Sequence, residues 1–160
     1  MLPRGEAALR AARIVALAVP AGLLAGAYVS QYGFGLFPCE MCWWQRYAHF
    51  SALPFALLAF GMPRSGRPVA LAVLGIAASA LIGGYHAGVE YHWWDGFTAC
   101  TSTADLSSGN ALDAILNAPM IRCDQAQWTL AGISLAGYNF LFSGAGALLA
   151  AVLLARSRKV

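Results

Sequence analysis

The sequence predicts an all-α membrane protein, a single domain over residues 1–160 that folds as a bundle of four transmembrane helices. Hydrophobic residues make up 59% of the chain and charged residues only 11%, whereas soluble domains average about 45 to 50% and about 25%. Long uncharged stretches run between Arg13 and Glu40, Arg46 and Arg64, Arg67 and Glu90, and Asp124 and Arg156. Each can hold a spanning helix, which needs about 20 mainly apolar residues.

These stretches place the helices at about residues 14–32, 43–62, 68–88 and 130–155. The segments at about 33–42 and 89–127 then lie together on one side of the membrane. Within the longer segment, Asn110 and Asp113 can cap a short amphipathic helix that ends before Pro119. We expect that helix to lie at the membrane surface, with a helix packed against protein as the alternative.

The basic residues near the helix ends gather on the other side of the predicted bundle. They are Arg4, Arg10, Arg13, Arg64, Arg67, Arg156, Arg158 and Lys159. Because basic residues beside membrane helices stay in the cytoplasm, we expect cytoplasmic termini and periplasmic loops in a bacterial inner membrane. The net charge of +3 then reflects topology, and the scatter of the basic residues argues against nucleic-acid binding.

Small residues and tryptophans also follow this arrangement. Small residues recur four apart at Gly22 and Gly26 and again at Gly75, Ser79 and Gly83. Such residues let membrane helices approach closely. An aromatic belt at the outer boundary would explain the five tryptophans, which are Trp43, Trp44, Trp93, Trp94 and Trp128.

The cysteines all fall on the predicted periplasmic side, at Cys39, Cys42, Cys100 and Cys123. That compartment is oxidising, so disulfides are expected, with three possible pairings of which proximity favours Cys39 with Cys42. These two form a Cys-X-X-Cys motif at a helix start, and Arg46 lies about one turn beyond Cys42. A helix N-terminus and a nearby cation stabilise a thiolate, so the motif predicts a redox-active pair.

Structural roles for the cysteines are the alternatives. A disulfide between Cys39 and Cys42 could be an inert staple, although so small a loop adds little stabilisation. A zinc site would need four thiolates held close together. The wide separation of Cys100 and Cys123, in an oxidising compartment, argues against zinc.

Three ionisable residues lie near or inside the predicted spans. Arg46 could extend to the lipid headgroups, but its place beside the cysteine pair favours a functional role. His49 fits an interfacial histidine whose hydrogen bonds are satisfied. His86 lies within a span, where an ionisable group is a candidate for function.

The stretch from Pro38 to Arg46 resembles the signature of the DsbB family, bacterial inner-membrane thiol:quinone oxidoreductases. Two further stretches are similar to that family, His86 to Glu90 and Ser134 to Asn139. The predicted spans, the inward termini and a cysteine pair in each outer segment extend the resemblance over nearly the whole chain. The weakest stretch lies between Cys100 and Cys123.

The resemblance implies a relay that reoxidises a DsbA-like periplasmic protein of the thioredoxin fold. A disulfide between Cys100 and Cys123 would oxidise this partner, with Cys100 forming the mixed disulfide. Cys123 would then engage Cys39 and free Cys42 as a thiolate. The electrons would pass to a membrane quinone, either ubiquinone or menaquinone.

The resemblance also implies which residues hold the quinone. Arg46 would lie beside the quinone ring, together with His86. A vitamin K epoxide reductase-like enzyme is the nearest alternative, although its cysteine pair lies late in the bundle. A non-enzymatic membrane protein stapled by disulfides is the other alternative, and its thiols would never cycle.

Overall fold

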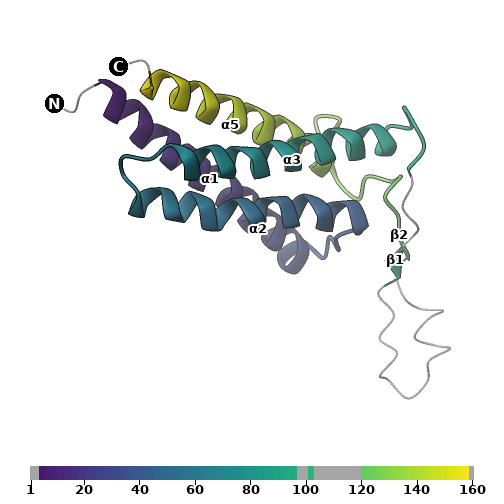
Figure 1. The fold of residues 1–160 in the computed structure, drawn as a ribbon. Helices are drawn as coiled ribbons and strands as arrows, with labels where there is room; N and C mark the ends of the chain where they lie inside the picture. Colours follow the sequence, from purple (N-terminus) through teal and green to yellow (C-terminus); the bar gives the residue numbers. More distant parts are fainter. Residues whose placement is uncertain (1–3, 97–100, 103–119, 159–160) are drawn as a thin grey trace.

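The computed structural model describes residues 4–96, 101–102 and 120–158. Four long helices make up most of this part of the chain, namely α1 (Arg4–Phe34), α2 (Glu40–Gly61), α3 (Arg67–Glu90) and α5 (Leu135–Ser157). They form a bundle in which α2 packs on α3, α3 on α5 and α5 on α1. Both termini lie at one end of the bundle (Figure 1). The predicted all-α fold class is confirmed.

Three of the helices, α1, α3 and α5, have the length and hydropathy to cross a membrane. The fourth, α2, is not among them, because it carries Gln45, Arg46 and His49 in an otherwise apolar sequence. These polar side chains are turned into the bundle, with exposures of 6%, 7% and 3%. The remaining surface of α2 includes large apolar side chains such as Phe55, Leu57 and Leu58.

Local chemistry sets where the helices begin. Cys39 is the N-cap of α2, and its sulfur accepts a hydrogen bond from the Cys42 amide at 3.3 Å. A serine caps α5, where the Ser134 hydroxyl accepts from the Gly137 amide at 3.1 Å. These contacts pair amide groups that have no partner inside a helix.

Two short hairpins lie at the end of the bundle away from the termini (Figure 1). In one, β1 (Thr101–Ser102) pairs with β2 (Met120–Ile121), and in the other β3 (Thr129–Leu130) pairs with β4 (Ile133–Ser134), both antiparallel. The last helix therefore begins at Leu135 and not near residue 130. The two turn residues, Ala131 and Gly132, have positive φ angles of 50° and 77°, which a helix cannot contain. The predicted amphipathic helix, between Asn110 and Pro119, lies outside the described residues.

The small residues contribute to packing at some positions only. A Cβ atom on Gly75 would lie 3.0 Å from the Ala52 side chain, and one on Gly83 would lie 2.8 Å from Asn139 Nδ2. Both glycines therefore permit close helix contacts, as predicted. Gly22 and Gly26 have nothing within 4 Å of such an atom. They line a cavity instead.

The end that carries the termini is closed by small apolar side chains around Ala12, Ala16, Ala56 and Ala59. Arg13, only 8% exposed, donates a hydrogen bond from Nη2 to the carbonyl oxygen of Pro63. This contact ties α1 to the turn between α2 and α3. The tryptophans flank the opposite helix ends, with Trp43 and Trp44 in the first turns of α2 and Trp93 and Trp94 just after α3.

Candidate functional site

Three of the four cysteines meet at the end of the bundle away from the termini. Cys39 and Cys42 open α2, and their Sγ atoms are 2.9 Å apart. Cys123 follows β2, and its Sγ lies within 4.8 Å of both the Cys39 Sγ and a ring nitrogen of His86. The neighbouring Ile121 packs into the same buried cluster and fixes this segment against α2. Cys100 lies outside the described residues.

Cys39 is the central sulfur of this group. Its side chain is 2% exposed. The pKa of the Cys39 thiol is raised, first by its hydrogen bond with the Cys123 sulfur, then by that with Cys42 and by burial. Cys39 thus keeps its proton in the reduced site and donates it to the Cys42 sulfur. Cys42 is the more exposed sulfur of the motif.

His86 lies on α3 directly against the sulfurs. It is 1% exposed, and its Nε2 atom is 3.5 Å from Cys39 Sγ. The carboxylate of Glu90, one turn later on α3, places Oε1 3.7 Å from the same Nε2. The other oxygen, Oε2, is buried without a hydrogen-bond partner among the described residues. An imidazole and a carboxylate thus accompany the cysteine pair.

Arg46 is held inside the bundle by α1. Its Nη1 donates to the Gln31 side chain at 2.6 Å, and its Nη2 donates to the carbonyl oxygen of Ala27 at 3.2 Å. The guanidinium carbon lies 5.0 Å from the ring centres of both Tyr28 and Trp43. These contacts and an exposure of 7% show that Arg46 is anchored between two helices and does not extend freely to the headgroups.

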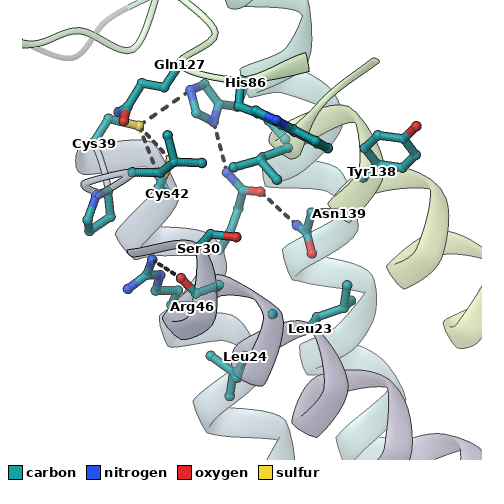
Figure 2. Close-up of a pocket in the computed structure, with 18 of the residues that line it drawn as sticks. Leu23, Leu24, Ser30, Cys39, Cys42, Arg46, His86, Gln127, Tyr138 and Asn139 are labelled. Carbon is teal, nitrogen blue, oxygen red and sulfur yellow. Dashed lines mark hydrogen bonds between the residues drawn. The ribbon is translucent and has the colours of Figure 1, made fainter. Parts of the chain in front are cut away.

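A cavity of about 270 Å³ opens beside these residues, bounded mainly by α1, α2 and α5. Cys42, Arg46 and His49 follow one another along the α2 side of it, at the spacing of one helix face. Apolar and glycine residues form most of the other walls, including Leu23, Leu24, Gly22, Gly26, Ala27 and Phe142. Figure 2 shows Cys39, Cys42 and His86 at one end, with Arg46 further along. A largely apolar lining with a few polar groups is typical of small-molecule sites.

The structure adds polar residues to which the sequence analysis gave no role. Gln45 lies between Met41 and His86, and Asn139 reaches it from α5. Gln31 holds Arg46, and Glu90 accompanies His86. The sequence held one signal for these residues. Polar side chains are rare inside apolar membrane helices unless they have partners, so their presence there indicates a role.

A buried cysteine pair, with a third sulfur and an imidazole close by at one end of an apolar helical bundle, defines a membrane protein of thiol–disulfide exchange. The profile of the family described as "Disulfide bond formation protein DsbB" matches residues 9–153. The chain belongs to the DsbB family, and its role is that of an oxidoreductase in disulfide bond formation. The resemblance seen in its motifs is confirmed.

Two curated proteins are similar to the chain. "Disulfide bond formation protein B" of Aromatoleum aromaticum (strain DSM 19018 / LMG 30748 / EbN1) is 29% identical over 152 residues, which cover 88% of this chain and 89% of the relative. A protein of Rickettsia prowazekii (strain Madrid E), named there as uncharacterized, is 24% identical over 125 residues, covering 75% and 73%. No solved structure matches the chain.

A metal site is the other chemistry that this grouping of side chains allows. Cys39, His86 and Cys123 are ligands that zinc accepts. Disulfide bond formation, the role of the family, requires sulfurs that exchange partners. A tightly bound metal ion would block that exchange because it binds the same thiolates.

Proposed function

We propose that the protein is a thiol:quinone oxidoreductase that reoxidises a DsbA-like periplasmic protein and passes the electrons to a membrane quinone. One observation carries this proposal. The Cys39–Cys42 pair, suited to disulfide chemistry, borders a largely apolar cavity inside the bundle that is also lined by the anchored cation Arg46. A soluble dithiol can approach the sulfurs from the periplasm, while a lipid-soluble acceptor can enter between the helices.

The proposed relay uses the cysteines in sequence. A disulfide between Cys100 and Cys123 is attacked by a partner thiolate, which bonds to Cys100 and releases Cys123 as a thiolate. Cys123 then attacks Cys39 of the Cys39–Cys42 disulfide and releases Cys42, which carries the electron pair of the broken bond. The position of Cys123 Sγ beside Cys39 supports this order. A second partner thiolate attacks the partner sulfur of the mixed disulfide, closes the partner's own disulfide and releases Cys100 as a thiolate. Cys100 then attacks Cys123 of the Cys39–Cys123 bond, which reforms the Cys100–Cys123 disulfide and releases Cys39, so that the Cys39–Cys42 pair holds the two electrons.

The cavity residues fit a quinone as the electron acceptor. A bound quinone, ubiquinone or menaquinone, takes up two electrons and two protons and leaves as quinol. Cys42 and Arg46 lie one turn apart on the same cavity wall, so Arg46 is placed to stabilise negative charge both on the sulfur and on a ring oxygen. His86 lines the same cavity from α3. We assign Arg46 and His86 to quinone binding.

We further propose four spans in the bacterial inner membrane, with α2 as the fourth. The burial of Gln45, Arg46 and His49 supports this, because their polar groups are shielded from lipid by the other helices. The basic residues Arg64 and Arg67, in the turn between α2 and α3, lie at the same end as the termini. That end then faces the cytoplasm, and the cysteines face the periplasm.

Thiol labelling tests this orientation. In reduced cells with a permeabilised outer membrane, a membrane-impermeant maleimide should label the four native cysteines. A second variant lacks the native cysteines and carries Ser65→Cys in the cytoplasmic turn. Its single cysteine should stay protected from the maleimide until the inner membrane is opened. If the native cysteines were protected and the introduced cysteine were labelled, the protein would have the opposite orientation in the membrane.

Steady-state turnover tests the function. The purified protein in detergent should reduce quinone when a reduced thioredoxin-fold dithiol protein is added, and it should show no reduction without that protein. Comparing ubiquinone with menaquinone identifies the acceptor that is used. A non-enzymatic stapled protein would leave both quinones unreduced.

A further inference from the structure

A chain of hydrogen bonds crosses the bundle directly below the cysteines and ends on His86. It joins Ser79 on α3, Asn139 on α5 and Gln45 on α2 before it returns to α3 at His86. Gln45 and Ser79 are 6% and 0% exposed. Figure 2 labels Asn139 and His86, and the hydrogen bonds of Gln45 join these two residues. Two backbone carbonyl groups in this chain determine the direction of every hydrogen bond.

The first of these groups is the carbonyl oxygen of Ser79, 3.1 Å from Asn139 Nδ2. A carbonyl oxygen only accepts, so the amide nitrogen of Asn139 must face it. The second hydrogen on Nδ2 points to Gln45 Oε1, at 2.8 Å. Asn139 Oδ1 then accepts from the Ser143 hydroxyl at 2.9 Å and from His49 Nε2 at 3.0 Å.

The second group is the carbonyl oxygen of Met41, 3.1 Å from Gln45 Nε2. By the same argument Gln45 Nε2 faces the Met41 carbonyl oxygen, and Gln45 Oε1 faces Asn139. The two carbonyl groups belong to different helices and assign the same direction to the shared Gln45–Asn139 bond. The remaining hydrogen on Gln45 Nε2 therefore points to His86 Nδ1, at 3.0 Å.

We infer that Asn139 and Gln45 are positioning residues that hold His86 as the tautomer protonated at Nε2. His86 Nδ1 accepts from Gln45 and so carries no proton in the neutral ring. The Nε2–H group is left facing Cys39 Sγ at 3.5 Å and Glu90 Oε1 at 3.7 Å. The opposite tautomer would turn a lone pair toward the sulfurs.

The consequence for catalysis rests on the proposed function. When the Cys39–Cys42 disulfide is opened, the released sulfur becomes a thiolate that carries the electron pair of the broken bond. In the relay this thiolate is Cys42, whose sulfur lies 2.9 Å from Cys39 Sγ, the sulfur that the Nε2–H group faces. The fixed donor therefore stabilises the negative charge of the cysteine pair without reorganisation. Asn139 and Gln45, which also line the cavity, act on the charge of the cysteine pair through His86. Gly83 allows this arrangement, because a Cβ atom there would lie 2.8 Å from Asn139 Nδ2.

Nitrogen NMR of the reduced, ¹⁵N-histidine-labelled protein in detergent tests the tautomer directly. The chain has 3 histidines, so loss of signals in His86→Gln identifies those of His86. Above the pH at which the ring becomes neutral, Nδ1 should resonate as an unprotonated nitrogen and Nε2 as a protonated one. The reverse pattern, or averaged signals from both tautomers, would refute the tautomer assignment. The spectrum of the wild-type protein is sufficient for this test.

Two variants test the positioning residues, with a third as the control. Gln45→Met and Asn139→Leu should move the two His86 resonances toward each other and lower quinone-coupled turnover about tenfold. Ser143→Ala removes a donor to Asn139 Oδ1 but leaves the Gln45 side intact, so it should behave as wild type.

Unchanged His86 resonances in Gln45→Met or Asn139→Leu would remove that residue from the positioning role. If one variant does not fold, the other variant and the wild-type spectrum still decide the inference. A wild-type protein that has the expected tautomer but reduces no quinone would refute the proposed function and leave the tautomer assignment standing.

Discussion

Replacing Cys42 with serine is expected to lower quinone reduction more than about a thousandfold, because the sulfur that delivers electrons to the cavity is lost. The same change should let a disulfide between Cys39 and Cys123 accumulate. Cys39 can attack Cys123 of the Cys100–Cys123 disulfide and release Cys100. The sulfurs of Cys39 and Cys123 lie within 4.8 Å of each other, and no Cys42 thiol remains to attack Cys39 and break the new bond. Non-reducing electrophoresis after proteolysis, followed by mass spectrometry, measures this linkage.

Cys39→Ser is the matched control for this expectation. It removes one sulfur from the same motif and should also stop turnover, yet it cannot form the linkage to Cys123. Formation of a Cys42–Cys123 disulfide in Cys39→Ser, in the amount in which the Cys39–Cys123 disulfide forms in Cys42→Ser, would contradict the proposed role of Cys39. The relay would then have to reach the motif through a different sulfur.

Arg46→Met is expected to raise the apparent KM for quinone by about tenfold to a hundredfold, the loss that accompanies removal of a charge-assisted hydrogen bond. Single-turnover oxidation of the dithiol partner through Cys100 should stay near that of wild type. Arg46→Lys keeps the charge but loses the planar guanidinium group that contacts Gln31 and Ala27. The quinone KM of Arg46→Lys should therefore lie between that of the wild type and that of Arg46→Met. Quinone titrations of equally folded, detergent-purified variants measure this order.

Arg13→Met is the control for a purely structural effect. Arg13 is also a nearly buried arginine that ties α1 to a neighbouring segment, but it lies at the cytoplasmic end of the proposed topology. It should reduce the yield of folded protein and leave the quinone KM unchanged. If Arg46→Met behaves in the same way, Arg46 is a structural residue and does not bind quinone.

The sequence predicted the helices and the cysteine motif well, because both depend on local features. Charge-free stretches mark the helices, and the motif marks the start of α2 at Cys39 and Cys42. The hairpin at Ala131 and Gly132 was missed because its strands have only 2 residues each and the second strand continues directly into α5. Hydropathy does not distinguish such a strand from the first turn of a helix.

The contacts around His86 could not be predicted from the sequence. In a membrane helix, lipid and neighbouring helices both favour apolar side chains, so periodicity does not show which face is buried. Gln45 and Asn139 are far apart in sequence and meet only through the packing of α2 against α3 and α5. The proximity of Cys39 to Cys123 was expected from family resemblance alone, and the structure now brings the two sulfurs together.

An electron balance under anaerobic conditions tests the proposed reaction most directly. Reduced dithiol partner, oxidised quinone and catalytic amounts of the protein are mixed without oxygen, and disulfide and quinol are quantified together. One quinol should form for each partner disulfide, and neither should form with Cys42→Ser. Partner oxidation without an equal amount of quinol, or quinol formation in Cys42→Ser, would contradict electron transfer through this cysteine pair to a quinone.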